Sequence, residues 1–148
     1  MLDKKKWKSQ LSKARRGDDE AQWYVASFYH DGYVDNEGNT IVQKDIKRAA
    51  HWYRLSAEQG NTSSQIGIGI LYSTQDGIDL DFEKALNWTM LAYENGDKSA
   101  AHNIATIYRD KEQYRKAFSW YKRSVKHGFW DSLLEYGMCL YFGIGTKK

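Results

Sequence analysis

Apolar and small residues recur along this chain at spacings that fit one face of an α-helix. In three segments they stand at offsets of zero, three, four, seven and eight, which is the pattern of a helix with 3.6 residues per turn. The three series are Ala49, Trp52, Tyr53, Ser56 and Ala57; Ala85, Trp88, Thr89, Ala92 and Tyr93; and Ala117, Trp120, Tyr121, Ser124 and Val125. The pattern predicts three amphipathic helices, each with a structural tryptophan.

A second pattern starts at four glycines, Gly17, Gly60, Gly96 and Gly128. Each is followed by a small residue at the fourth place, an apolar or aromatic one at the eighth, a tiny one at the ninth and, in three cases, Tyr at the twelfth. The segments read GDDEAQWYVASFY, GNTSSQIGIGILY, GDKSAAHNIATIY and GFWDSLLEYGMCL. This pattern also predicts helices, and the tiny ninth residue allows a second helix to approach closely.

The two helix types alternate, so the chain is predicted to fold as stacked helical hairpins. Asp45 and Asp81 stand where an N-cap residue accepts the free amide hydrogens of a first turn. The repeat glycines suit the left-handed residue that follows a helix C-terminus. Self-similarity at intervals of 43, 36 and 32 residues is typical of a repeat solenoid. Only residues 32–44 and the first few residues are predicted to be irregular.

At these positions the chain resembles the Sel1-like repeats, relatives of the tetratricopeptide repeats. The matching segments are SSQIGIGILY, DIKRAAHWYRLSAEQG and YGMCLYFGIG, and the likeness covers about residues 17 to 148. The resemblance implies an all-α fold, a right-handed α–α superhelix of about three and a half hairpins. It implies one domain, residues 1–148, with a basic capping helix at 1–16 and repeats that start near 17, 60, 96 and 128.

Composition agrees with such a fold and narrows the setting. The chain of 148 residues has no proline, 15% aromatic residues and a mean hydropathy of −0.76. No apolar run is long enough to cross a membrane, and the basic start has no apolar stretch after it, so no membrane role and no secretory signal are expected. Cys139 is the only cysteine. Some secreted members of the family carry a disulfide in each repeat, so a reducing cytoplasm is the expected location.

No catalytic or cofactor motif is found. The histidines His30, His51, His102 and His127 show no metal-ligand spacing, and no cofactor or metal is expected. Cys139 is expected to be a buried, inert thiol in a helix that faces the core. The acidic pair Asp18 and Asp19 lies at a helix start, where capping explains it better than acid–base catalysis. The sequence therefore predicts a protein that is not an enzyme.

The N-terminal segment contains a run of basic residues: Lys4, Lys5, Lys6, Lys8, Lys13, Arg15 and Arg16. Together with Trp7 as a stacking platform, they suggest a nucleic-acid surface. The favoured interpretation is a solvated capping helix, with Trp7, Leu11 and Ala14 turned inward, because the net charge is only +3. Nucleic acid is therefore an unlikely partner.

The likeness to tetratricopeptide repeats implies a binding face on the concave side of the superhelix. The positions concerned lie three, six, ten, thirteen and fourteen places after each repeat glycine. We expect partner contacts from Trp23, Ser27, His30, Ile66, Ile70, His102, Thr106, Arg109, Leu134, Met138 and Tyr141. Several of these are too apolar for a solvated groove, although the superhelix can also bury some of them against neighbouring helices.

Two further features point to partners. The connection at residues 32–45 is longer than its counterparts, and loops of this kind often contact a ligand. After GIGTKK no Trp-type helix follows, so the apolar face of Leu133, Tyr136 and Leu140 is expected to be partly uncovered and open to self-association or docking.

The expected function is non-catalytic binding of another protein. What the family resemblance suggests most concretely is a small bacterial immunity protein that binds and blocks a toxin or effector. A general adaptor in signalling or host contact is the main alternative, and nucleic-acid binding through the basic helix is a third.

Overall fold

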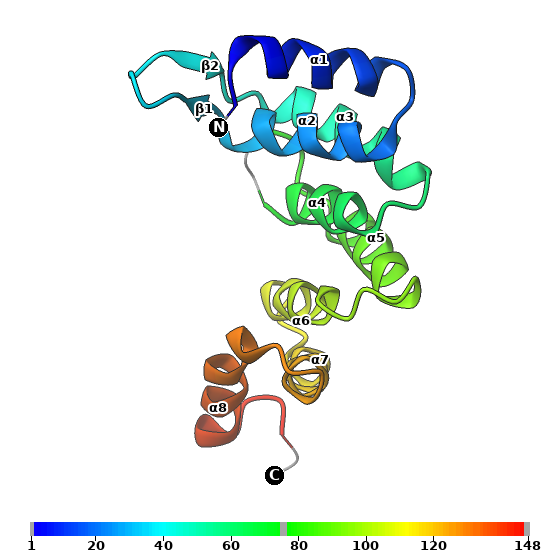
Figure 1. Cartoon of the computed structure of the whole chain (residues 1–148). Coiled ribbons are helices and arrows are strands. Elements are labelled where there is room, and N and C mark those ends of the chain that lie inside the picture. The colour runs from blue at the N-terminus through cyan, green and yellow to red at the C-terminus, as the bar shows by residue number, and fades with distance from the viewer. Residues whose placement is uncertain (1, 75–76, 147–148) are drawn as a thin grey trace.

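The chain forms a curved stack of antiparallel helices, shown in Figure 1, and the computed structural model describes residues 2–74 and 77–146. Within these residues, three hairpins follow a capping helix, and a single helix ends the stack. The helices are α1 Lys4–Arg15, α2 Asp19–Asp31, α3 Ile46–Glu58, α4 Thr62–Ser73, α5 Phe82–Glu94, α6 Ala100–Asp110, α7 Tyr114–Lys126 and α8 Leu133–Phe142, with a short 3₁₀ turn at Trp130–Ser132. The predicted right-handed solenoid of about three and a half hairpins is confirmed.

The predicted helix caps are present. An Asp45 carboxylate oxygen accepts a hydrogen bond of 2.9 Å from the Arg48 backbone N–H, and Asp81 accepts one of 3.0 Å from that of Lys84. Asp18 caps α2 in the same way. Because these side chains satisfy amide hydrogens that the helix itself leaves free, each cap fixes where its helix begins.

The repeat glycines form the turn inside each Trp-type to Gly-led connection. Gly17, Gly60, Gly96 and Gly128 have φ of 96°, 97°, 102° and 86°, in the left-handed region that favours glycine. Behind Gly17 the N–H of Asp18 bonds back to the Lys13 carbonyl, which closes the end of α1. The predicted left-handed helix ends are thus confirmed.

Gly69, the tiny ninth residue of α4, is where α4 and α5 approach most closely. A Cβ at Gly69 would lie 2.6 Å from Cγ2 of Thr89 and 3.1 Å from the Ala85 carbonyl oxygen. The equivalent residues Ala26 and Ala105 are fully buried. Close contact within a hairpin therefore depends on a residue with little or no side chain at this position.

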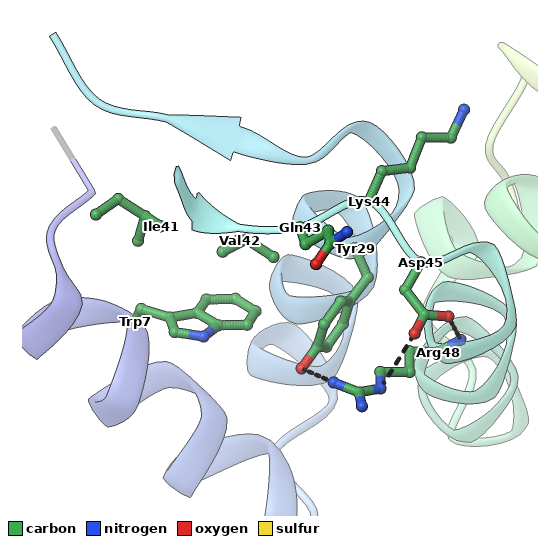
Figure 2. Close-up of a pocket in the computed structure, with 8 residues that line it drawn as sticks. All are labelled: Trp7, Tyr29, Ile41, Val42, Gln43, Lys44, Asp45 and Arg48. Carbon is green, nitrogen blue, oxygen red and sulfur yellow. Dashed lines mark hydrogen bonds and ion pairs between the residues drawn. The ribbon is translucent and has the colours of Figure 1, made fainter. Parts of the chain in front are cut away.

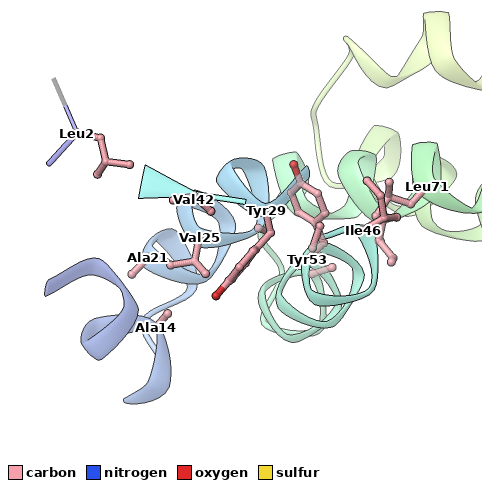
Figure 3. Packing of buried hydrophobic residues seen from close by; sticks show 13 residues of the cluster. Leu2, Ala14, Ala21, Val25, Tyr29, Val42, Ile46, Tyr53 and Leu71 are labelled. Carbon is pink, nitrogen blue, oxygen red and sulfur yellow. The ribbon is translucent and has the colours of Figure 1, made fainter. Parts of the chain in front are cut away.

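The first core cluster joins α1, the first hairpin and α4 (Figure 3). Val25 and Tyr29 of α2 pack between Ala14 of α1 and Tyr53 of α3, and Leu71 brings in α4. Trp7 and Leu11 of α1 pack against the same cluster, so the predicted capping role of α1 is correct. Two smaller clusters continue the core through α5 to α7.

The repeat tryptophans pack against these clusters but stay half-buried rather than fully buried. Trp52 and Trp88 lie against the first cluster, and Trp120 lies against the other two. The Trp120 ring also meets Tyr93 edge-on at 5.0 Å between ring centroids. These tryptophans are structural, as predicted, although part of each indole remains in solvent.

Two buried glutamines link consecutive helices across the glycine turns. Gln22 Nε2 donates to the Ala14 carbonyl at 3.1 Å, and Gln65 Nε2 donates to the Ala57 carbonyl at 3.2 Å. Each glutamine also accepts a side-chain amide from the next turn in the stack, Gln59 for Gln22 and Asn95 for Gln65. The third hairpin has Ala101 at this position, which provides no such bridge.

The long connection after α2 is not irregular, contrary to the prediction. It forms a small antiparallel hairpin, β1 Tyr33–Val34 and β2 Thr40–Val42. At its turn, Asp35 accepts hydrogen bonds from the backbone N–H groups of Glu37 and Asn39. Val42 is buried in the first core cluster, so the β-hairpin is tied to the helices by an apolar side chain. The sequence analysis recognised the turn residues but not the strand pairing that they connect.

Candidate functional site

The predicted binding residues of the first two hairpins are less available than expected. Trp23 and Ile66 are half-buried and pack against the first and second core clusters. Ser27 and Ile70 are also half-buried, and the Ser27 hydroxyl donates to the Tyr24 carbonyl of its own helix at 2.8 Å. The expectation that Trp23 lies outside the packing of the repeats is therefore wrong, because the superhelix tucks this indole against its neighbours.

In the third hairpin the predicted residues gather around Tyr121 of α7. The Arg109 Nη1 donates to the Tyr121 hydroxyl at 3.4 Å, and Thr106 Oγ1 lies 3.5 Å from the same oxygen. The His102 ring lies 6.0 Å from the Tyr121 ring, between centroids. His30 and Tyr53 form a similar pair in the first hairpin, at 6.2 Å. A buried tyrosine of the Trp-type helix thus forms the floor beneath these positions.

Arg109 provides the exposed positive charge of this group. Its Nη2 lies 3.0 Å from an Asp110 carboxylate oxygen, and 44% of its side chain remains exposed. Partial burial opposes the charge, but Tyr121, Asp110 and Glu135 outweigh that effect, so the pKa of Arg109 is raised. The guanidinium therefore stays charged and keeps free N–H donors towards solvent.

A small cavity of about 260 Å³ lies beside this cluster, between α7 and α8. Tyr121, Glu135 and Cys139 line it, with Met138 at its apolar side. Burial raises the pKa of the Cys139 thiol, and the neighbouring Glu135 charge adds to this effect. Because the thiolate is disfavoured, Cys139 lacks the environment of a nucleophilic cysteine.

α8 differs from the expected core-facing helix, because none of its residues is fully buried. Leu134, Met138 and Tyr141 expose 70%, 48% and 84% of their surface. They line one shallow cavity of about 570 Å³ with Trp130, Leu133, Gly137 and Phe142. Tyr136 alone of the predicted uncovered face is turned inward, where it stacks on Phe118. An apolar surface of this kind is typical of a partner site.

The structure also contains a cavity of about 400 Å³ that the sequence analysis did not locate (Figure 2). Trp7 and Tyr29 form its walls, β2 borders it, and Arg48 lies at its edge. Arg48 Nη1 donates to the Tyr29 hydroxyl at 3.5 Å, and its Nε lies 3.2 Å from Asp45. The length of the connection at residues 32–45 was the only signal for a site here.

The basic helix α1 lacks the stacking platform that the nucleic-acid interpretation needs. The Trp7 ring meets Tyr29 edge-on at 5.4 Å and Phe28 at 6.2 Å, so it belongs to the core. Without a free aromatic face, the lysines of α1 offer only a screened charge interaction with a phosphate backbone.

In the described part of the chain, no group of three or more His, Cys, Asp or Glu residues is placed to hold a metal ion. Across residues 2–74 and 77–146, no helix is both long enough and apolar enough to span a membrane.

Comparison with known proteins identifies the class of protein that this fold and this surface define. The family model described as Sel1 repeat matches residues 19–61, 62–97, 99–129 and 130–148. The chain therefore belongs to the Sel1 repeat family, whose members generally mediate protein–protein interaction. No curated protein matches the chain.

Two solved structures resemble the chain along almost its whole length. A Sel1 repeat protein from Oxalobacter formigenes has a TM-score of 0.82 and 24% identity, over 97% of this chain and 56% of that one. A protective antigen from uropathogenic Escherichia coli strains, described as displaying an SLR fold, has a TM-score of 0.80 and 26% identity, over 97% and 30%. The chain spans about half and about a third of these two proteins.

Proposed function

We propose that this protein binds another protein through the concave positions of its C-terminal half. The observation that carries the proposal is the exposure of Leu134, Met138 and Tyr141 around one apolar cavity of α8. Arg109 lies near this surface, since it shares the smaller cavity with Met138. Apolar and aromatic anchors beside an arginine form the composition that dominates binding energy in protein interfaces.

The partner that we propose is a toxin or effector whose active surface the bound repeats cover. Support for this finer proposal is the analogy with stand-alone immunity proteins of the same family, which is an argument from fold. A role as an adaptor in host contact is the second candidate. The likeness to the protective antigen from uropathogenic Escherichia coli favours it.

A capture experiment with matched variants tests the binding surface. Tagged wild-type protein, Arg109→Ala, Tyr141→Ala and Leu91→Ala are incubated with an extract of the source organism, and captured proteins are identified by mass spectrometry. Arg109→Ala and Tyr141→Ala are each expected to weaken binding by about 2 kcal/mol, roughly 30-fold. Leu91, an exposed residue of α5 outside the predicted face, serves as the control.

Equal capture by all four proteins would place the interface elsewhere on the molecule. The captured protein is then expressed alone and together with the repeat protein. Arrested growth that co-expression relieves supports the antagonist role, whereas growth unaffected by the captured protein favours the adaptor. Neutralising Lys4, Lys5 and Lys6 together should matter less, and mainly at low salt; abolished binding would transfer the interface to α1.

A further inference from the structure

One face of α8 is open where the equivalent face of every earlier Gly-led helix is covered. It consists of Leu133, Gly137 and Leu140, which stand five, nine and twelve places after Gly128. Leu133 and Leu140 expose 47% and 54% of their surface. At the fifth place the other helices have Gln22, Gln65 and Ala101, and at the ninth Ala26, Gly69 and Ala105, all buried.

The earlier helices show what covers this face. In each case it is the next helix of the same hairpin, which places an alanine and a residue four positions later against the ninth residue. Against Gly69 these are Ala85 and Thr89 of α5. Against Ala105 they are Ala117 and Tyr121 of α7, within one buried cluster. Residues four apart lie on the same side of a helix, so the two act together.

The open face has room for such a helix. A Cβ at Gly137 would meet nothing within 4 Å, whereas one at Gly69 would collide with α5. After α8 the chain turns towards the start of α7, where Gly145 lies against the backbone of Tyr114. The segment that follows α8 within the described residues therefore leaves Leu133, Gly137 and Leu140 uncovered.

We propose that this face docks a single amphipathic helix from another protein, with Ala at one position and Thr or Tyr four residues later. Residues 129–146 contain Asp131 and Glu135 and no lysine or arginine, so a docking helix with a basic polar side is favoured. A second copy is a poor source, because its α3, α5 and α7 already pack inside their own hairpins. This face is separate from the one formed by Leu134, Met138 and Tyr141.

The chain supplies a suitable probe in its own α7, which has the Ala117 and Tyr121 pair and a basic polar side. The probe is a labelled peptide that copies residues 113–127, held helical by a covalent staple between the positions of Ser119 and Arg123. Binding to the full protein is followed by fluorescence anisotropy. We expect saturable binding that weakens at least tenfold with Gly137→Leu in the protein or with Ala117→Leu in the peptide.

Phe142→Ala, on the same helix but outside the open face, should change peptide binding less than threefold. A thermal melt of each variant checks the fold, and Gly137→Leu is expected to fold because the site is open. Absence of saturable binding, or equal binding by both leucine variants, overturns the proposal. It is also overturned if sedimentation shows a dimer that Gly137→Leu dissociates and the peptide does not, since the occupant is then a second copy.

Discussion

Alanine at Gly69 and alanine at Gly137 should change stability in opposite directions, although both glycines occupy the ninth place of a repeat. At Gly69 the added Cβ would lie 2.6 Å from Thr89 Cγ2 and 3.1 Å from the Ala85 carbonyl oxygen. Overpacking of this kind costs about 1–3 kcal/mol. Alanine recovers about 1 kcal/mol of helix propensity, so a net loss of about 1 kcal/mol is expected. At Gly137 nothing lies within 4 Å, and only the gain of about 1 kcal/mol remains.

The clash at Gly69 can be isolated with a second substitution. Thr89→Ser removes Cγ2 but keeps the hydroxyl, which bonds to the Ala85 carbonyl at 2.8 Å. Gly69→Ala should therefore cost less in the Thr89→Ser background than in the wild type. We expect a coupling free energy of about 1 kcal/mol between the two sites, since they are in direct contact.

Urea denaturation followed by far-UV circular dichroism measures the free energy of unfolding of each variant. Amide hydrogen exchange on α8 complements it, because a terminal helix can open without the rest of the chain. If Gly69→Ala stabilises the protein as much as Gly137→Ala does, then α4 and α5 do not pack as closely as described. If Thr89→Ser leaves the cost of Gly69→Ala unchanged, Cγ2 is not the atom in the way.

Three further predictions follow from burial. Desolvation and, to a lesser extent, the Asp31 charge raise the pKa of Tyr53 to about 12, above the usual value of 10.0; because the folded state favours the neutral phenol, stability should be full below pH 10 and fall between pH 10 and 12, and urea curves for Tyr53→Phe should show a smaller fall. Trp120→Ala should cost about 3 kcal/mol, the low end for such a change, since the indole is half-buried; a urea curve like that of the wild type would refute this. Trp23→Ala should lower stability by about 2 kcal/mol, and an unchanged melting temperature would show that its packing contributes nothing.

The features that the sequence predicted well are those set by local chemistry. An aspartate before an apolar periodic run can cap the helix from within a few residues, as Asp45 and Asp81 do. A glycine after such a run takes a conformation that other residues avoid, so Gly60 marked a helix end reliably. The repeated spacing then fixed the hairpin order, because each hairpin can bury its apolar face only against the next one.

The features that were missed depend on contacts between distant segments. Trp23 looked free because its position lies outside the repeat pattern, but it packs against the first core cluster. The β-hairpin at residues 33–42 was missed because two short strands carry too few residues for an alternating pattern. The prediction that Cys139 lies in a core-facing helix failed because the ribbon of apolar residues in α8 has no covering helix among the described residues. The partner site itself stays a prediction.

The two glutamine bridges imply that local stability is unequal along the stack. In a repeat protein each unit is held mainly by its neighbours, so every cross-link between units raises the free energy at which that junction opens. Gln22 and Gln65 tie the junctions α1–α2 and α3–α4, whereas Ala101 leaves the junction α5–α6 to apolar packing alone. Backbone amides of α6 to α8 should therefore exchange faster than those of α2 to α4, and the part of the chain that carries the exposed apolar surface is also the part most able to adjust its curvature to a bound partner.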